Sequence, residues 1–194
     1  MSHTENAPAA DAALGKALIS QARDAIAEYL DLPRTPPLEH PALDEPGATF
    51  VTLTQAGQLR GCIGQLEASR PTRQDVRTNA VAAATRDPRY TVVTVDEWPD
   101  IGVEVSLLGP MTFEPCRDMA QALACIEPDV DGVVLIAGCN HATFLPQVWR
   151  KLPDARTFLQ QLMLKAGMTH WPEDMLLGRY RVHEFHETHS DTRH

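Results

Sequence analysis

The stretch Leu59-Arg60-Gly61-Cys62-Ile63-Gly64 says more about the fold of this 194-residue chain than any other. Residues 48–54, rich in Thr, Val and Phe, precede it, and the turn residues 55–58 lie between the two runs. This order predicts a β-hairpin. Glycine at two positions of a strand gives up side-chain packing, which indicates a close approach by another segment or by a ligand. In an extended chain Arg60 and Cys62 share one face.

Segments on both sides of the hairpin predict helices. Apolar residues recur at helical spacing from Leu14 to Tyr29, with Asp11 as the N-cap and Pro33 as the stop. The proline-rich residues 33–46 predict an extended passage that wraps around the domain. A second helix opens near Ser69 and Pro71 and ends before Asp87-Pro88. Its inward face carries small side chains, namely Val76, Ala80, Ala83 and Ala84.

The second half of the chain adds strands and short helices. Residues 101–108 alternate between apolar and polar, residues 133–137 form an apolar run, and residues 178–185 offer a last strand. Short helices are expected at 118–126, after Pro146 and after Asp154. Helices and hairpins mixed in this order favour an α+β fold, with a mixed or antiparallel sheet flanked by helices, over a doubly wound sheet.

Composition restricts the classes of function. The net charge of −9 argues against a general binder of nucleic acid or of anionic membranes. No run approaches the roughly 18 apolar residues of a membrane helix, and the N-terminus shows no signal peptide. The four cysteines are widely spaced, which disfavours a zinc or redox motif. We therefore expect a cytoplasmic protein with reduced thiols, no metal site and no cofactor.

Further segments fit the pattern of a known family. They are residues 103–108 (V-E-V-S-L-L), 142–149 (A-T-F-L-P-Q-V-W) and 165–167 (K-A-G). With the hexamer, their order and spacing resemble the AMMECR domain family, called AmmeMemoRadiSam system protein A in its bacterial and archaeal form. The likeness runs from about Ala12 to Phe185. It implies one α+β domain over residues 11–186, with a main sheet and a smaller subdomain, between a flexible N-terminus (1–10) and a flexible tail (187–194).

The resemblance also implies partners and candidate residues. Prokaryotic members look like partners of a Memo-type protein, related to extradiol dioxygenases, and of a radical S-adenosylmethionine enzyme. The family brings no established substrate. Onto this chain it transfers Arg60, Gly61, Cys62, Gly64 and Glu104 as functional candidates. Where relatives tend to carry Arg or Lys before A-T-F-L-P, this chain has His141, so any anion binding at that position is in doubt.

Cys62 has two interpretations. As a reactive group it would be a thiolate nucleophile or a soft ligand, with Arg60 lowering its pKa and Glu104 or His141 carrying the proton. As a structural residue it would be an inert, buried strand side chain. Glu104 itself is either a general base or the partner of an arginine such as Arg60.

The glycines also have two interpretations. Gly61 and Gly64 either admit a ligand, or Gly61 makes room for the alanine-rich helix while Gly64 forms a bulge.

Two charged stretches also have alternative interpretations. Residues 55–90 contain six arginines and three acids. These arginines form either an anion site at a helix N-terminus or a solvated charged face. The His-rich residues 183–189 lack the H-E-x-x-H spacing of zinc proteases. We therefore expect adventitious metal binding by a flexible tail there, and not a true metal site.

Two hypotheses of function follow. The first is a component of a Memo/radical-enzyme modification system, with a pocket lined by Arg60, Cys62, Glu104 and His141 for a small anionic ligand or a peptide. The alternative is a non-catalytic interaction module that docks through the glycine-bearing strand. The sequence leaves open whether the protein is an enzyme.

Overall fold

The structure, a computed structural model, describes residues 12–187, and these form two compact units. The first unit holds the described residues through Leu107 together with those from His183 onward, and the second is Leu108–Val182. Each unit contains one antiparallel sheet of four strands. The α+β prediction is therefore confirmed, and each unit is described by itself below.

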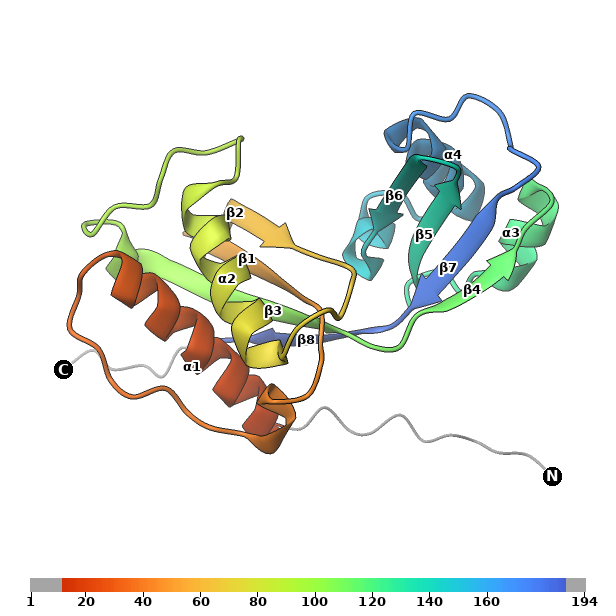
Figure 1. Ribbon diagram of the computed structural model, residues 1–194. Coiled ribbons are helices and arrows are strands. Elements are labelled where there is room, and N and C mark those ends of the chain that lie inside the picture. The colour runs from red at the N-terminus through yellow and green to blue at the C-terminus, as the bar shows by residue number, and fades with distance from the viewer. Residues whose placement is uncertain (1–11, 188–194) are drawn as a thin grey trace. The chain divides into compact units, whose positions relative to one another are not determined.

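The first unit has its helices on one side of its sheet. The strand order is β2-β1-β3-β8. Side chains of Val51, Leu53, Val103 and Val105 form one buried cluster with residues of α1 and α2, so both helices cover the same face (Figure 1). The opposite face is not covered by either helix. The elements are α1 (Ala12–Tyr29), β1 (Thr49–Gln55), β2 (Gln58–Gly64), α2 (Thr72–Thr85), β3 (Ile101–Leu108) and β8 (Val182–His186), with short 3-10 helices at Pro41–Leu43 and Trp98–Asp100.

The predicted hairpin is present and turns at Ala56 and Gly57, which both have positive φ (49° and 75°), as a two-residue I′ hairpin turn requires. Between β1 and β2 the register shifts: Leu53 pairs with Gly61 and Thr54 with Leu59. Arg60 is therefore the extra residue of a bulge. The bulge is therefore not at Gly64, where the structural interpretation of the glycines places it.

Packing explains both glycines of the hexamer. A Cβ atom at Gly61 would lie 2.3 Å from the carbonyl oxygen of Ala83, so the absence of a side chain lets α2 approach the sheet. A Cβ atom at Gly64 would lie 2.3 Å from the ring of Phe50. The interpretation that Gly61 makes room for the alanine-rich helix is confirmed.

Arginines of the basic stretch 55–90 form ion pairs with acids. The proline-rich residues 33–46 lie beside α1. Arg77 pairs with Asp24 and Glu28 at 2.6 Å each, and Arg70 pairs with Asp75 at 2.9 Å. Arg73 pairs with Glu39 and Asp44 in the same way. The helix N-terminus therefore presents paired arginines instead of an anion site. Residues 33–46 run beside α1, as the wrapping prediction required, and Arg34 pairs with Asp24 at 2.7 Å.

The second unit also contains a four-stranded sheet, and its strand order is β4-β7-β5-β6. Asp154 caps one of its two helices, as predicted, by accepting a bond from the amide of Thr157, and Asp118 caps the other by accepting from the amide of Gln121. Trp149 stacks on Phe158 in the core with ring centroids 3.7 Å apart. The elements are β4 (Thr112–Pro115), α3 (Met119–Cys125), β5 (Gly132–Ala137), β6 (Asn140–Phe144), a 3-10 helix (Pro146–Arg150), α4 (Ala155–Lys165) and β7 (Leu176–Tyr180).

Three boundaries differ from the prediction. The strand expected at 178–185 is two strands in two different sheets, β7 and β8, because the chain passes from one unit to the other there. The exposed strand β4 was not foreseen. Glu187, assigned to the tail, is held by a bidentate ion pair with Arg23 at 2.7 Å. Residues 1–11, which include the expected cap Asp11, and 188–194 lie outside the described range.

Within residues 12–187, no helix has both the length and the apolar character needed to cross a membrane.

Candidate functional site

The uncovered face of the first unit's sheet carries the candidate site. Thr52 on β1 pairs with Cys62 on β2 and with Glu104 on β3. Because side chains directly opposite one another share a face, these three form a row across three strands. Their neighbours along β1, Val51 and Leu53, are fully buried on the helix side. The row therefore lies on the face away from α1 and α2, which we call the open face.

His186 on β8 extends the row to a fourth strand. Its Nδ1 lies 3.7 Å from Oε1 of Glu104, and its Nε2 lies 3.7 Å from Oε2 of Glu184. The side chains of Glu104, Glu184 and His186 are 40%, 27% and 59% exposed. Sequence reasoning missed His186 at this site, because it treated the histidines as part of a loose tail.

The Cys62 thiol is half-buried and is not held as a thiolate. Burial raises its pKa, and the negative charges of Asp87 and Glu104 raise it further. The hydroxyl of Thr52, which donates to Sγ across 3.3 Å, and the charge of Arg89 act in the opposite direction. The net direction is upward, so the thiol is protonated at neutral pH.

Arg60 is engaged elsewhere. Its Nε and one terminal nitrogen donate to the carboxylate of Glu97 at 3.1 and 3.2 Å, and its other terminal nitrogen donates to the carbonyl of Thr91 at 2.9 Å. The expectation that Arg60 lowers the pKa of Cys62 does not fit this geometry, because the guanidinium stabilises Glu97 instead and lowers the pKa of that carboxyl. The bulge at Arg60 breaks the simple alternation on which the expectation rested.

The outer edge of β2 is closed at Cys62. The backbone amide of Cys62 donates to Oδ2 of Asp87 at 2.9 Å, and Asp87 forms an ion pair with Arg89 at 2.7 Å. A strand added at this edge would have to displace the carboxylate. Nothing in the sequence marks Asp87 as a neighbour of Cys62, since the two residues meet only through the packing of α2 on the sheet.

The remaining candidate, His141, belongs to the second unit. It is exposed on β6 and pairs with Ile136 of β5. Of the predicted residues, Cys62 and Glu104 lie together on the open face, and the structure adds Thr52 and His186 to them. The Arg60 guanidinium is bound elsewhere, and Gly61 and Gly64 contribute no side chains.

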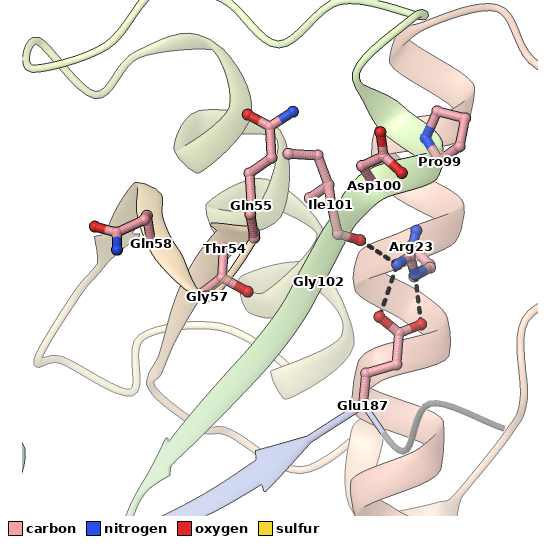
Figure 2. A pocket seen from close by; sticks show the side chains of 11 residues that line it. Arg23, Thr54, Gln55, Gly57, Gln58, Pro99, Asp100, Ile101, Gly102 and Glu187 are labelled. Atoms are coloured by element: carbon pink, nitrogen blue, oxygen red, sulfur yellow. Dashed lines mark hydrogen bonds and ion pairs between the residues drawn. The ribbon is translucent and has the colours of Figure 1, made fainter. Parts of the chain in front are cut away.

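A cavity of about 940 Å³ lies at the hairpin end of the first unit's sheet, and its lining comes from both faces: Thr54 and Gly102 lie on the open face, whereas Gln55 and Ile101 lie on the face that the helices cover. Figure 2 shows Arg23 and Glu187 on one side of it, joined by their ion pair, with Gln55 and Asp100 beside Ile101. Glu187 also accepts a bond from the amide of Val103 at 3.2 Å. The cavity is lined by Arg23, residues 54–58, residues 99–102 and Glu187.

The cavity reaches the open face near the row of polar side chains, at Thr54 and Gly102. Two of its lining residues, Thr54 and Gly102, pair with each other in the sheet. The next pair on the same face is Thr52 with Glu104, two residues along each strand. Strand geometry places these two pairs about 7 Å apart.

Metal chemistry has no ready ligand set in the described range. Among residues 12–187, no group of three or more His, Cys, Asp and Glu side chains is arranged to hold a metal ion. The two ring nitrogens of His186 face different carboxylates, so one ion cannot bridge all three groups.

Comparison with known proteins shows what the chain is similar to. A family model described as AMMECR1 matches residues 19–185. A protein of Thermotoga maritima is 36% identical over 138 residues, covering 70% of this chain and 75% of that protein. A protein of Methanothermobacter thermautotrophicus is 34% identical over 180 residues, covering 89% and 94%. The crystal structure of uncharacterized protein PH0010 from Pyrococcus horikoshii matches with a TM-score of 0.78 and 30% identity, over 88% of this chain and 89% of that one.

Proposed function

The chain belongs to the AMMECR1 family, and from that premise we propose that it is an accessory component of a modification system. Its partners in the proposal are a Memo-type protein and a radical S-adenosylmethionine enzyme, as the family resemblance implies. The proposal includes a cytoplasmic location, where the four free cysteines stay reduced.

One observation carries the proposal. Cys62, Thr52 and Glu104 form a polar row on a sheet face that neither helix of its unit covers. A sheet face with accessible polar groups and an adjoining cavity is a surface on which a segment of a partner can lie. In this proposal the open face is the docking surface.

The state of the thiol favours binding over bond chemistry. A nucleophilic cysteine needs a lowered pKa or an adjacent base, whereas burial raises the pKa of Cys62. Arg60, which is close to Cys62 in the sequence, and Arg89, whose charge acts on the thiol, are both paired with acids. The docking hypothesis is therefore the better supported of the two that the sequence raised, although backbone pairing at the β2 edge is closed at Cys62.

A catalytic role of Cys62 is the second candidate, favoured by one observation. A thiol, a carboxylate and an imidazole lie on one face of adjacent strands, with Glu104 3.7 Å from His186. In that role Cys62 would be the nucleophile and Glu104 or His186 the proton carrier.

The test is direct binding to a purified Memo-type protein. We expect Glu104→Lys to weaken binding at least about tenfold, because it reverses a charge at the centre of the docking surface. The matched control is Glu127→Lys, which alters an exposed carboxylate of the second unit. Unchanged binding by Glu104→Lys would overturn the docking surface. A Cys62→Ser variant that binds normally favours docking over catalysis.

A further inference from the structure

We propose that Arg23 and the backbone amide of Val103 form a carboxylate-binding site, which Glu187 occupies from within the chain. The ligand is a carboxylate, carried by a small acid or by the C-terminus of a peptide, and it takes the place of the Glu187 side chain. The site adjoins the cavity that Arg23 and Glu187 line. The inference goes beyond the docking function and does not depend on it. An anionic ligand was expected beside Arg60, whereas the proposed site is at Arg23.

Three N–H groups converge on the carboxylate of Glu187. Nε and one terminal nitrogen of Arg23 donate to its two oxygens at 2.7 Å each, and the amide of Val103 donates to Oε2 at 3.2 Å. A guanidinium that donates two parallel bonds matches the planar shape of any carboxylate. The donors belong to α1 and β3, whereas the acceptor is one side chain directly after β8. Another carboxylate can therefore satisfy the same donors.

The guanidinium of Arg23 is held in place by groups other than Glu187. One of its terminal nitrogens also donates to the carbonyl of Ile101, and its central carbon lies 4.5 Å from the centroid of the Trp98 ring. A guanidinium over an indole face is attracted by the π-system of the ring. Neither contact involves the carboxylate, so both orient the donors before a ligand arrives. Such preorganisation lowers the entropic cost of binding.

The amide of Val103 is bonded to a side chain where a regular ladder would supply a backbone carbonyl. The carbonyl of Val103 accepts from the amide of Glu187 at 3.3 Å. In a regular antiparallel pair the two residues exchange both of their backbone bonds. Here the side chain of Glu187 takes the second bond instead. Removing this carboxylate frees a strand amide directly beside a guanidinium, and backbone amides of this kind capture carboxylates in peptide recognition.

The cavity gives a ligand access to these donors. The side chains of Arg23 and Glu187 are 29% and 26% exposed, so solvent reaches the ion pair. Figure 2 shows the pair at the wall of the cavity, whose volume is about 940 Å³. The side-chain amides of Gln55 and Gln58 line the same space. They can bind peptide groups of a ligand that is larger than its carboxylate.

Glu187 competes with a ligand in the native chain. A group tethered next to its site has an effective concentration of about 1 mM or more, so an external carboxylate binds the native chain weakly. Glu187→Ala removes the competitor and keeps all three donors. Asp100 also lines the cavity, and its charge opposes an anion. Adding Asp100→Asn to Glu187→Ala should therefore strengthen binding further.

The test titrates the full-length Glu187→Ala chain with sodium acetate and follows the amide chemical shift of Val103. We expect saturation with a Kd on the order of 10 mM and none with chloride at the same ionic strength. The native chain should bind acetate at least about tenfold more weakly, because its own carboxylate competes. Acetylglycylglycine should bind at least about threefold more tightly than acetate, because it adds hydrogen bonds to Gln55 and Gln58. Equal affinities would overturn the peptide source and assign the site to small acids.

Variants connect the binding to these donors. Glu184→Ala is the matched control, since it removes a carboxylate of β8 that pairs with His186, and it should behave as the native chain does. Arg23→Gln combined with Glu187→Ala should abolish saturation. If Glu187→Ala does not fold, Glu187→Gln keeps an oxygen for the Val103 amide and should still bind acetate more tightly than the native chain. Equal affinity of the native chain and Glu187→Ala, no binding by either variant of Glu187, or binding that persists without Arg23 would overturn the site.

Discussion

The backbone amide of Cys62 is bonded to the carboxylate of Asp87 across 2.9 Å, although 25 residues separate them. Hydrogen bonds from Arg89 hold the pKa of Asp87 far below its usual range, so this group is a carboxylate at any ordinary pH. It closes the edge of β2 and at the same time places a negative charge beside the thiol. Burial is the largest cause that raises the pKa of Cys62, and a residue outside the hexamer adds to it.

Replacing Asp87 tests this control. Asp87→Asn keeps an acceptor for the Cys62 amide and removes the charge that raises the thiol pKa, so alkylation of Cys62 at pH 8 should accelerate a few-fold. Thr52→Val removes the hydrogen bond that lowers the pKa, so alkylation should slow. Rates are measured by mass spectrometry with iodoacetamide. Equal rates in both variants would show that access alone governs the thiol.

The four thiols should react in a fixed order in the native protein. Cys139 is exposed in the turn between β5 and β6 and should be alkylated first. Cys62 and Cys125 are half-buried, whereas Cys116 is 3% exposed and its pKa is raised by burial. Peptide mapping after short exposures at pH 7.5 gives the order, and full denaturation is the control that should abolish it. Reaction of Cys62 before Cys139 would contradict the raised pKa of Cys62 and revive the catalytic hypothesis.

Much of the fold could be predicted because local signals agree with tertiary packing. The alternation in residues 101–108 and the cap at Asp154 place β3 and α4 closely, and the short helix expected at 118–126 is α3. The division of residues 178–185 between two sheets left no such signal, since periodicity continues across Arg181 while the hydrogen-bonding partners change. Strand β4 has only four residues, all exposed, and so offers no apolar pattern.

The site was harder to predict than the fold. Cys62 and Glu104 were selected from their motifs, and the structure places them in one row through their shared partner Thr52. The environment of Cys62 depends on contacts that have no sequence pattern. A one-residue bulge directs Arg60 to Glu97, and the end of α2 brings Asp87 to the strand. Such contacts follow from register and helix position, which local residue preferences do not determine.

Gly61→Ala should destabilise the protein by about 1–3 kcal/mol through overpacking. The added Cβ would lie 2.3 Å from the carbonyl oxygen of Ala83, a backbone atom that moves only if α2 shifts. Urea denaturation followed by circular dichroism measures the change. The matched control is Gly109→Ala, whose nearest contact would be 3.3 Å and which should cost less. Equal stability of Gly61→Ala and wild type would favour the ligand-approach interpretation of this glycine.

Asp24 should make stability depend on pH in the acid range. Its side chain is 3% exposed and is bound by Arg34 and Arg77 at 2.7 and 2.6 Å. The hydrogen bond from Arg34 is the largest cause that lowers its pKa from 3.8 to about 2. Because the folded state has the lower pKa, the ion pair stabilises the protein fully above pH 4, and this contribution is lost as the pH falls from about 4 to 2.

The loss should be on the order of 2 kcal/mol, since one pKa unit corresponds to about 1.4 kcal/mol. Asp24→Asn should remove that contribution at pH 7 and flatten the profile between pH 4 and 2. Asp44→Asn, which alters a carboxyl 72% exposed, should follow the wild-type profile within about 0.5 kcal/mol. Urea melts at several pH values give both profiles. A wild-type stability that stays constant down to pH 2 would mean that Arg34 and Arg77 do not hold Asp24 as the structure shows.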